Sequence, residues 1–347
     1  MKREKSENPA NARRFVSAQQ VAKRAGVSRS AVSRAFTPGA SIAPETREKV
    51  MRAALELGYH VNDLARGLLA NRSRLVGLVV TKPEVGFRAH LVSALTRALV
   101  LRGSVPLVIN TGSMEQELHA AQAALFGYRA EATIILSGSP PASFVDLARR
   151  NGQPLIMIGR AETDCDHVRI DNSGAARMAA RILVERGHRH LALAGVAAAT
   201  PSLAERERAF TQEARALGMT VAAGHARDAT YAGGQAAADA LFARDGSRHE
   251  RPDAVFCVND LMAIGLIDRA RGRFGLRIPE DVAVIGFDDI PEAAWDAYRL
   301  TTFRQDPEKM AEAAVAHLER RLADPDAPPE LLRLEAALVE RETTRSR

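Results

Sequence analysis

Three polar side chains in the segment VAKRAGVSRSAVSRAF, residues 21–36, have the chemistry to contact DNA. Arg29 carries a fork of N–H donors that matches O6 and N7 of guanine, and Ser30 can hydrogen-bond to a base or a phosphate. Arg34 lies five residues after Arg29 and points from another face of a helix, where a backbone phosphate or an edge base is the nearer target. The alternative is an ordinary α-helical hairpin whose arginines are solvated.

The apolar spacing around these side chains predicts three short helices within residues 15–60. Ser17 and Ser28 can cap the first two helices, and Gly26 can adopt the left-handed turn between them. A third helix follows and ends at Gly58. Because Arg29 and Ser30 would then occupy the exposed first turn of the second helix, the segment is predicted to be a DNA-binding helix-turn-helix.

The charge distribution favours the same partner. Residues 1–74 contain fifteen Lys or Arg and six Asp or Glu, a net charge of +9. Since the whole chain carries +6, the remaining 273 residues carry −3. A small basic module on a near-neutral body indicates a polyanion, because neutralising phosphates releases counterions. The alternative is a solvated basic tail, and residues 1–14 are predicted to be disordered because they offer little apolar surface to bury.

The rest of the chain alternates strands and helices. Near-continuous apolar runs such as LVGLVV (75–80), HLALAG (190–195) and VAVIGF (282–287) are typical of buried parallel strands. Amphipathic stretches that end in glycine, such as 174–187, lie between them. The strand–helix–strand pattern runs twice, which predicts two doubly wound parallel-sheet lobes in tandem. Ligands of such sheets bind at the carboxyl ends of the strands, so we expect a cleft site between the lobes.

Other classes of protein lack support in the sequence. No GxGxxG follows the first strand, and neither a GKS/GKT phosphate loop nor a GxSxG elbow is present. His188 and His190 lack the HExxH spacing of zinc ligands and are predicted to be surface residues. Cys165 and Cys257 have no metal-ligand or disulfide spacing. We therefore expect no catalytic activity, no cofactor and no metal. The N-terminal residues contain no apolar signal segment, and a soluble cytoplasmic protein is expected.

Several motifs in order resemble one known family. They are VAKRAGVSRSAVSRAF, ETREKVMRAALELGYHVNDLARGL, LVGLVV, VNDLMAIGLI, IPEDVAVIGFDDI and LTTFRQD. Together they resemble the lactose-repressor and galactose-repressor (LacI/GalR) family of bacterial transcriptional regulators, over nearly the whole chain from Phe15 onward. The resemblance implies a helix-turn-helix headpiece, a hinge helix and an α/β core similar to periplasmic binding proteins. It also implies a homodimer on a pseudo-palindromic operator.

The resemblance implies a set of DNA-contacting residues. Leu68 in the segment 62–68 corresponds to the apolar lever that the family inserts into the minor groove, and packing of the hinge on the core is its competing role. Gly67 lowers the helix propensity of that segment, consistent with a helix that forms only on DNA. The full set is Ser28, Arg29, Ser30, Arg34, Thr46, Asn62, Ala65 and Leu68.

For the effector, the resemblance points to an arginine, a carboxylate and two amides, whose donors and acceptors suit the hydroxyls of a sugar or sugar acid. The expected residues are Arg160, Arg206, Tyr231, Asn259, Asp288 and Gln305. Ala229 departs from the pattern, since many members carry a stacking aromatic there, and Tyr231 is the candidate replacement. Each polar residue has helix capping or lobe packing as its alternative role, and we expect that role for Asp260 and Asp289.

These expectations define a domain layout. We expect a tail at 1–14, a helix-turn-helix domain at 15–60 and a hinge at 61–74. The first lobe of the core is expected at 75–170 and 304–325, and the second at 171–303 and 326–342. The expected function is a transcriptional regulator, in the first instance a repressor, controlled by a small polar effector. A solute-binding protein and an α/β enzyme are the rival hypotheses.

Overall fold

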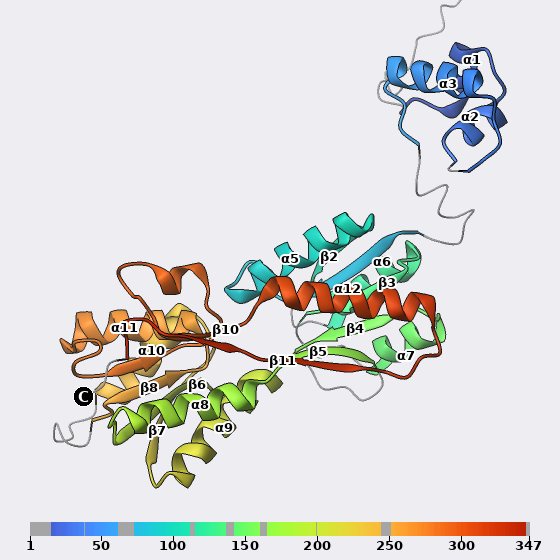
Figure 1. The fold of residues 1–347 in the computed structure, drawn as a ribbon. Coiled ribbons are helices and arrows are strands. Elements are labelled where there is room, and N and C mark those ends of the chain that lie inside the picture. The colour runs from blue at the N-terminus through green and yellow to red at the C-terminus, as the bar shows by residue number, and fades with distance from the viewer. Residues whose placement is uncertain are drawn as a thin grey trace, which may run out of the picture. The chain divides into compact units, whose positions relative to one another are not determined.

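The structure is a computed structural model that describes residues 15–37, 39–61, 73–111, 115–136, 142–159, 165–198, 200–243 and 251–344. The chain divides into two compact units, Met1–Ser73 and Arg74–Arg347. The first is the headpiece and the second is the core. Figure 1 shows the elements of each unit.

The headpiece contains the three predicted helices, α1 (Ala18–Ala25), α2 (Arg29–Ala35) and α3 (Pro44–Leu57). The Ser17 hydroxyl accepts a hydrogen bond from the Gln20 N–H, and Ser28 does the same for Ala31. Gly26 and Gly58 end α1 and α3 with φ of 67° and 65°, in the left-handed region that glycine adopts without a Cβ penalty. The predicted caps and stops of this unit are therefore confirmed.

A small apolar core holds the three helices together. Val21 from α1, Val32 from α2 and Val50 from α3 are almost completely buried and share one cluster. The Phe36 and Tyr59 rings pack against that cluster and meet each other edge to face, with their centroids 5.5 Å apart. One valine from each helix meeting in the centre explains why segments as short as seven residues are stable here.

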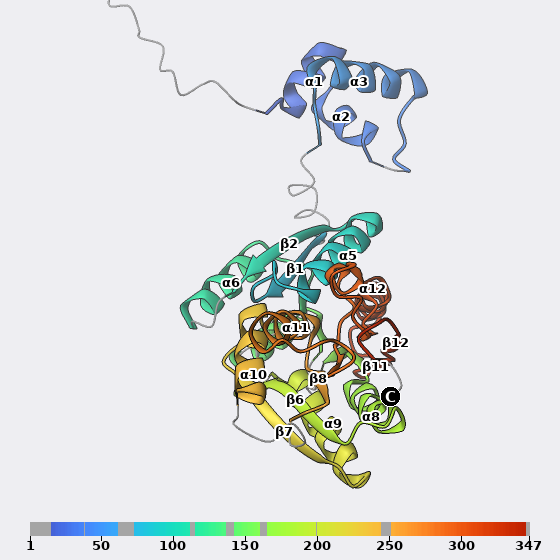
Figure 2. The same ribbon diagram turned by 90° about the vertical axis from the view of Figure 1, so that its left-hand side faces the viewer.

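The first lobe of the core is built on a parallel sheet in the order β11-β5-β4-β3-β1-β2. Helices α5 and α12 pack on one face, and α6 and α7 on the other (Figures 1 and 2). A Cβ at Gly77 in β1 would overlap the Leu125 side chain of α6, so a larger residue there would force Leu125 to shift. The elements are β1 (Leu75–Val80), α5 (Phe87–Arg102), β2 (Val105–Asn110), α6 (Glu115–Gly127), β3 (Ala132–Ile135), α7 (Ala142–Arg150), β4 (Leu155–Ile158), β5 (Asp166–Ile170), α12 (Pro307–Ala323) and β11 (Leu331–Leu334).

The second lobe has a parallel sheet in the order β7-β6-β8-β9. Helices α8 and α9 lie on one face and α10 and α11 on the other (Figures 1 and 2). The predicted tandem of doubly wound lobes is confirmed. The elements are α8 (Asn172–Glu185), β6 (His190–Val196), α9 (Pro201–Ala216), β7 (Thr220–Ala226), α10 (Tyr231–Phe242), β8 (Ala254–Cys257), α11 (Asp260–Phe274), β9 (Ala283–Ile285) and the 3₁₀ turn η2 (Pro291–Ala294).

The last crossover between the lobes lies later in the chain than the sequence predicted. Strand β11 pairs in parallel with β5 and is therefore an edge strand of the first sheet, although residues 326–342 were expected to lie in the second lobe. Only β12 (Ala337–Val339) returns to pair with β10 (Thr302–Arg304). The prediction missed β11 because it is an edge strand that alternates exposed and half-buried residues and lacks the continuous apolar run of a central strand.

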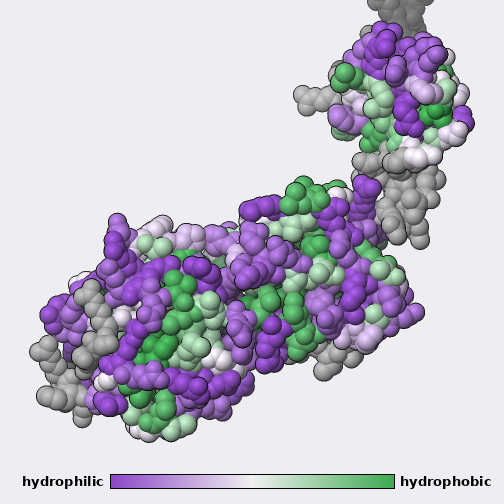
Figure 3. Space-filling view, viewed as in Figure 1, coloured by the Kyte–Doolittle hydropathy of each residue, from purple (hydrophilic) through white to green (hydrophobic). Residues whose placement is uncertain are grey.

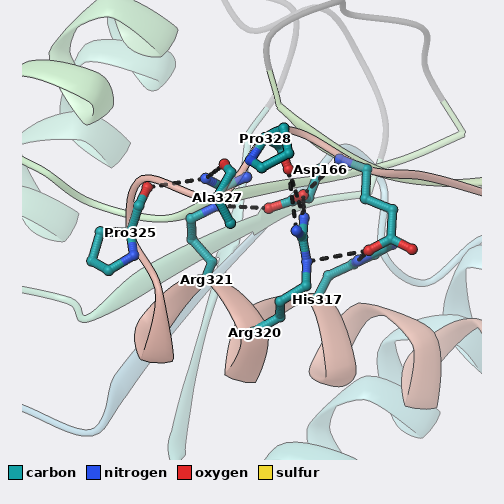
Figure 4. A network of polar contacts seen from close by, with 8 residues as sticks. Asp166, His317, Arg320, Arg321, Pro325, Ala327 and Pro328 are labelled. Atoms are coloured by element: carbon teal, nitrogen blue, oxygen red, sulfur yellow. Dashed lines mark hydrogen bonds and ion pairs between the residues drawn. The ribbon is translucent and has the colours of Figure 1, made fainter.

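A polar network fixes the loop between α12 and β11 (Figure 4). The buried Asp166 carboxylate accepts hydrogen bonds from Arg320, from Arg321 at 2.9 Å and from the Glu330 N–H at 3.0 Å. Both arginines also donate to carbonyls within the loop, among them Pro328 and Pro325. Hydrogen bonds from Arg321 and Glu330 outweigh the effect of burial and lower the pKa of Asp166. The network thereby anchors β11 on the first sheet.

In the described part of the chain, no helix is long and apolar enough to cross a membrane.

Candidate functional sites: the second headpiece helix and the core polar cluster

The first turn of α2 presents the predicted DNA-reading side chains. Arg29, Ser30 and Arg34 are exposed, and neither guanidinium hydrogen-bonds to or forms an ion pair with any other described residue. Ser28 is committed to its capping role, and its hydroxyl also lies 2.9 Å from that of Ser30. Thr46, at the start of α3, is half-buried. The guanidinium donors of Arg29 and Arg34 are thus available to a partner.

Sequence analysis missed Arg47, which positions α2. Its guanidinium donates to the Ala35 carbonyl at 2.6 Å and to the Ala40 carbonyl at 3.3 Å, and so ties α3 to the turn that follows α2. Its partners are backbone atoms, which leave no signature in the side-chain pattern. The remaining predicted DNA contacts, Asn62, Ala65 and Leu68, lie outside the described residues.

In the core, Arg206 of α9 is 4% exposed and held on several sides. Its Nε donates to Asn172 Oδ1 at 2.7 Å, and one terminal nitrogen donates to the Val258 carbonyl at 2.8 Å. That nitrogen also lies 3.6 Å from Asp288 Oδ1. The guanidinium stacks on the Phe287 ring, with its central carbon 3.4 Å from the ring centroid. Its orientation is therefore fixed before any ligand binds.

Asp288 stands on a strained turn just after β9. Its φ of 127° and the φ of 58° at Asp289 lie in a region that residues with a Cβ rarely adopt. Gln305 donates from Nε2 to Asp288 Oδ1 at 2.6 Å, and the two residues are also joined through their backbones. Such strain persists where the surroundings impose it, and it accumulates at functional sites. Arg206, Asp288 and Gln305 form what we call the polar cluster.

Burial sets the electrostatics of the polar cluster. It lowers the pKa of Arg206 to about 10, although the negative charge of Asp288 opposes the shift. It raises the pKa of Asp288 to about 6, although Arg206, Gln305 and Arg88 stabilise the carboxylate. A charged pair of this kind offers a ligand hydroxyl both a strong acceptor and a strong donor.

Arg88 approaches the polar cluster from the first lobe and is the main residue that the sequence interpretation missed. It lies in the first turn of α5 and donates to the Thr81 carbonyl at 2.8 Å. Its charge interacts with Asp288 of the second lobe. A charged residue soon after β1 was the available signal, but its pairing with Asp288 depends on how the two lobes meet.

Two of the predicted effector residues have other roles in the structure. Asn259 caps α11, with Oδ1 accepting from the Met262 N–H at 2.9 Å and Nδ2 donating to the Ala229 carbonyl at 3.0 Å. Tyr231 is outside the polar cluster, because its hydroxyl donates to Asp268 of α11 at 2.8 Å and its side chain is partly exposed. Arg160 lies outside the described residues.

Comparison with known proteins places both units. The model of bacterial regulatory proteins of the lacI family matches residues 18–62, and a periplasmic binding protein-like domain matches residues 180–344. The structure of the transcriptional regulator CelR in complex with cellobiose is 31% identical in sequence, with a TM-score of 0.69. The match covers 95% of this chain and 100% of that one. The chain belongs to the lacI family of bacterial regulatory proteins.

Two further relatives of this lacI-family regulator support the same family assignment. The HTH-type transcriptional repressor PurR of Vibrio cholerae serotype O1 (strain M66-2) is 29% identical over 332 residues, which is 94% of this chain and 97% of PurR. The Lac repressor bound to ONPG is 25% identical with a TM-score of 0.83, over 95% of this chain and 100% of that one. The predicted helix-turn-helix headpiece and periplasmic-binding-protein-like core are confirmed, and the chain is a DNA-binding transcriptional regulator.

Two acids next to the polar cluster are structural, as expected, but neither caps a helix. Asp260 accepts from the Thr302 hydroxyl at 2.6 Å and from the Ile290 N–H at 3.0 Å. Asp289 pairs with Arg304 and Arg341, each at 2.6 Å. Of the two expected roles, helix capping is therefore wrong for both residues, whose side chains instead join separate segments of the chain.

The prediction for His188 was also wrong. Its side chain is 1% exposed, and Nδ1 lies 3.6 Å from the Asp253 carboxylate. His190, two residues later, is exposed as expected. The sequence around His188 does not reveal its burial, because its acidic partner Asp253 lies 65 residues later in the chain.

The buried acids give this regulator a pH-dependent stability. Burial, with help from the nearby Asp288 charge, raises the pKa of Asp260 to about 8 from its ordinary 3.8. The folded chain therefore holds more protons than the unfolded chain between these values, and raising the pH favours unfolding. We expect the free energy of unfolding to fall between pH 5 and pH 8 by up to about 1.4 kcal/mol per pH unit for each such proton. Asp288 adds the same sign below about pH 6.

Urea unfolding at pH 5, 6, 7 and 8, followed by the fluorescence of Trp295, the single tryptophan, measures this slope. Asp166 and Asp253 have lowered pKa values and act only below about pH 4, so they leave this range undisturbed. Asp260→Asn should flatten the slope, since its amide can still accept from Ile290 and donate to Thr302. An unchanged slope in this variant would show that Asp260 is ionised at neutral pH.

Proposed function

We propose that this regulator is a cytoplasmic repressor whose affinity for a pseudo-palindromic operator is controlled by a sugar or sugar acid bound at the polar cluster. The observation that carries the proposal is the buried Arg206–Asp288 pair with Gln305 at 2.6 Å from the carboxylate. Burying these polar and charged groups costs free energy, and packing of the two lobes alone would not require them. Two carboxylate oxygens and a guanidinium suit adjacent hydroxyls, which donate to the acid and accept from the arginine.

Contacts across the lobes supply a route from ligand to conformation. Ser202 of the second lobe donates to the Gly159 carbonyl of the first at 2.7 Å, and Arg169 pairs with Glu205 at 2.9 Å. An effector between the lobes adds or removes such contacts and favours one lobe angle over another. In a dimer that angle sets the spacing of the two hinge segments, and so the fit to the operator.

The surface of the first lobe supports a homodimer. Val100 and Leu101 at the end of α5, together with Val105 and Val108 of the edge strand β2, are exposed. Figure 3 shows the hydrophobic surface over the end of α5. Large apolar side chains gathered at one edge are typical of protein interfaces, and a symmetric dimer matches a pseudo-palindromic operator.

The relatives favour a regulator over the rival hypotheses. PurR is a transcriptional repressor, CelR was solved with cellobiose and the Lac repressor with ONPG. We infer that this chain likewise binds DNA and a small polar ligand. A solute-binding protein would have no use for the basic helix-turn-helix, and no residue of the polar cluster is arranged as a nucleophile with an adjacent base.

Replacing Arg29 tests the DNA-reading part of the proposal. If Arg29 binds guanine through two hydrogen bonds, Arg29→Ala should weaken operator binding by roughly 1 to 3 kcal/mol and relax the preference at one base pair per half-site. Selection from random DNA with the wild type and the variant measures both effects. Arg24→Ala is the matched control, because Arg24 lies on α1 and pairs with Glu56. Identical preferences in all three proteins would assign Arg29 to phosphate contacts only.

A further inference from the structure

Arg88 lies where the loop after β1 meets the second lobe. The same loop contains Gly86, where an added Cβ would lie 3.1 Å from Leu261 Cδ1 in the first turn of α11. The Arg88 side chain is half-buried, and its hydrogen bond to the Thr81 carbonyl holds it to the first lobe. A long cationic side chain is thereby fixed at the boundary between the lobes.

Most of the hydrogen-bonding capacity of Arg88 is unused. Among the described residues its one hydrogen-bond partner is the Thr81 carbonyl, and no carboxylate lies within ion-pair distance. A guanidinium has five N–H donors in a planar fork, which fits a carboxylate or phosphate group. In contrast, the buried Arg206 donates to Asn172 and to the Val258 carbonyl, and it pairs with Asp288 at 3.6 Å. Arg88 is therefore the cation with donors to spare beside the polar cluster.

The charges around this point favour an anion. Arg206 offsets the Asp288 carboxylate from the second-lobe side, so the positive charge of Arg88 is left over within the group of three. Glu84, on the same loop, acts on Arg88 through its charge but is exposed and forms no ion pair with it, so its carboxylate leaves the guanidinium donors open to a ligand.

We propose that Arg88 recognises an acidic group of the effector, so that this regulator responds to a sugar acid or sugar phosphate rather than to a neutral sugar. The hydroxyls of the ligand bind at the polar cluster, and its carboxylate or phosphate bridges to the first lobe through Arg88. This inference rests on the proposed function and narrows its ligand class. It also gives the ligand one contact on each lobe, which is what a change in lobe angle requires.

Matched pairs of ligands test the inference on the full chain. Thermal unfolding is measured with D-glucose against D-glucuronate and D-gluconate, D-galactose against D-galacturonate, and D-ribose against D-ribose 5-phosphate. We expect an acidic sugar to raise the unfolding temperature more than its neutral partner does. Comparison of the carboxylates with ribose 5-phosphate shows which kind of acidic group is recognised. Stabilisation by neutral members alone, or by no acidic member, overturns the proposal. Neutral ligands whose binding is weakened by Asp288→Asn would still leave the proposed function intact.

Affinity measurements on variants then assign the contact. For an acidic ligand, Arg88→Gln should weaken binding by about 10- to 100-fold, the usual effect of removing a charge-assisted pair of hydrogen bonds. The same variant should leave binding of the neutral partner sugar within about twofold. Glu84→Gln, on the same loop, should leave acid binding unchanged or strengthen it slightly. Equal weakening for the acid and the neutral sugar in Arg88→Gln would assign Arg88 a structural role and overturn the proposal.

Discussion

Operator affinity should fall by about three to five decades between 50 and 200 mM salt. Residues 1–74 carry a net charge of +9, and the guanidinium groups of Arg29 and Arg34 in α2 have no partner among the described residues. A dimer of this size is expected to make about six to ten phosphate contacts, and each contact releases condensed counterions. Binding titrations at four or five salt concentrations give the slope directly.

Variants locate the source of that slope. Arg34→Gln should weaken binding equally on all sequences, because we expect Arg34 to touch phosphate. The slope should become shallower by about 0.9 for each phosphate that the variant no longer neutralises. Arg227→Gln on the core is the control, since that side chain is 97% exposed and far from the headpiece in sequence. A flat salt response in the wild type would mean that the basic charge of residues 1–74 is a solvated tail.

Local signals explain why the headpiece could be predicted from the sequence. Ser17, Ser28, Gly26 and Gly58 act on atoms within a few residues of themselves, and each cap and stop was found where it was expected. The strands of the two sheets were equally visible, because central parallel strands are buried on both faces and read as continuous apolar runs. Edge strand β11 lacks that signal, and the domain boundary was misplaced as a result.

The candidate site was predictable only in part. Arg206, Asp288 and Gln305 were found through family motifs, and the structure brings them together from α9, the turn after β9 and the segment before α12. The motifs could not show whether Asn259 or Arg88 belongs to the site. Asn259 follows a strand, as a ligand-binding residue does, but it is also placed to cap the next helix. The role of Arg88 depends on how the two lobes meet, and the spacing of apolar residues along the sequence does not reveal that contact.

Removal of the Asp288 carboxylate should uncouple the regulator from its effector. We expect Asp288→Asn to weaken effector binding by about 10- to 100-fold, since a hydrogen bond to a charged group contributes roughly 1.5 to 3 kcal/mol. The Asn side chain keeps an oxygen that can accept from Gln305, and Arg206 keeps its hydrogen bonds to Asn172 and Val258. The fold and effector-free operator binding should therefore survive. Asp296→Asn, in the same segment and 91% exposed, should change neither property.

Linkage between the two sites makes the test stringent. If the effector changes operator affinity by some factor, the operator must change effector affinity by the same factor. Leu68→Ala addresses the other end, because by resemblance Leu68 is the minor-groove lever. It should weaken operator binding while leaving effector affinity of the DNA-free protein unchanged, the reverse of Asp288→Asn. Calorimetry of each variant with effector, with operator and with both gives the four affinities of the cycle. If Asp288→Asn leaves the effector response whole, the effector binds somewhere other than the polar cluster.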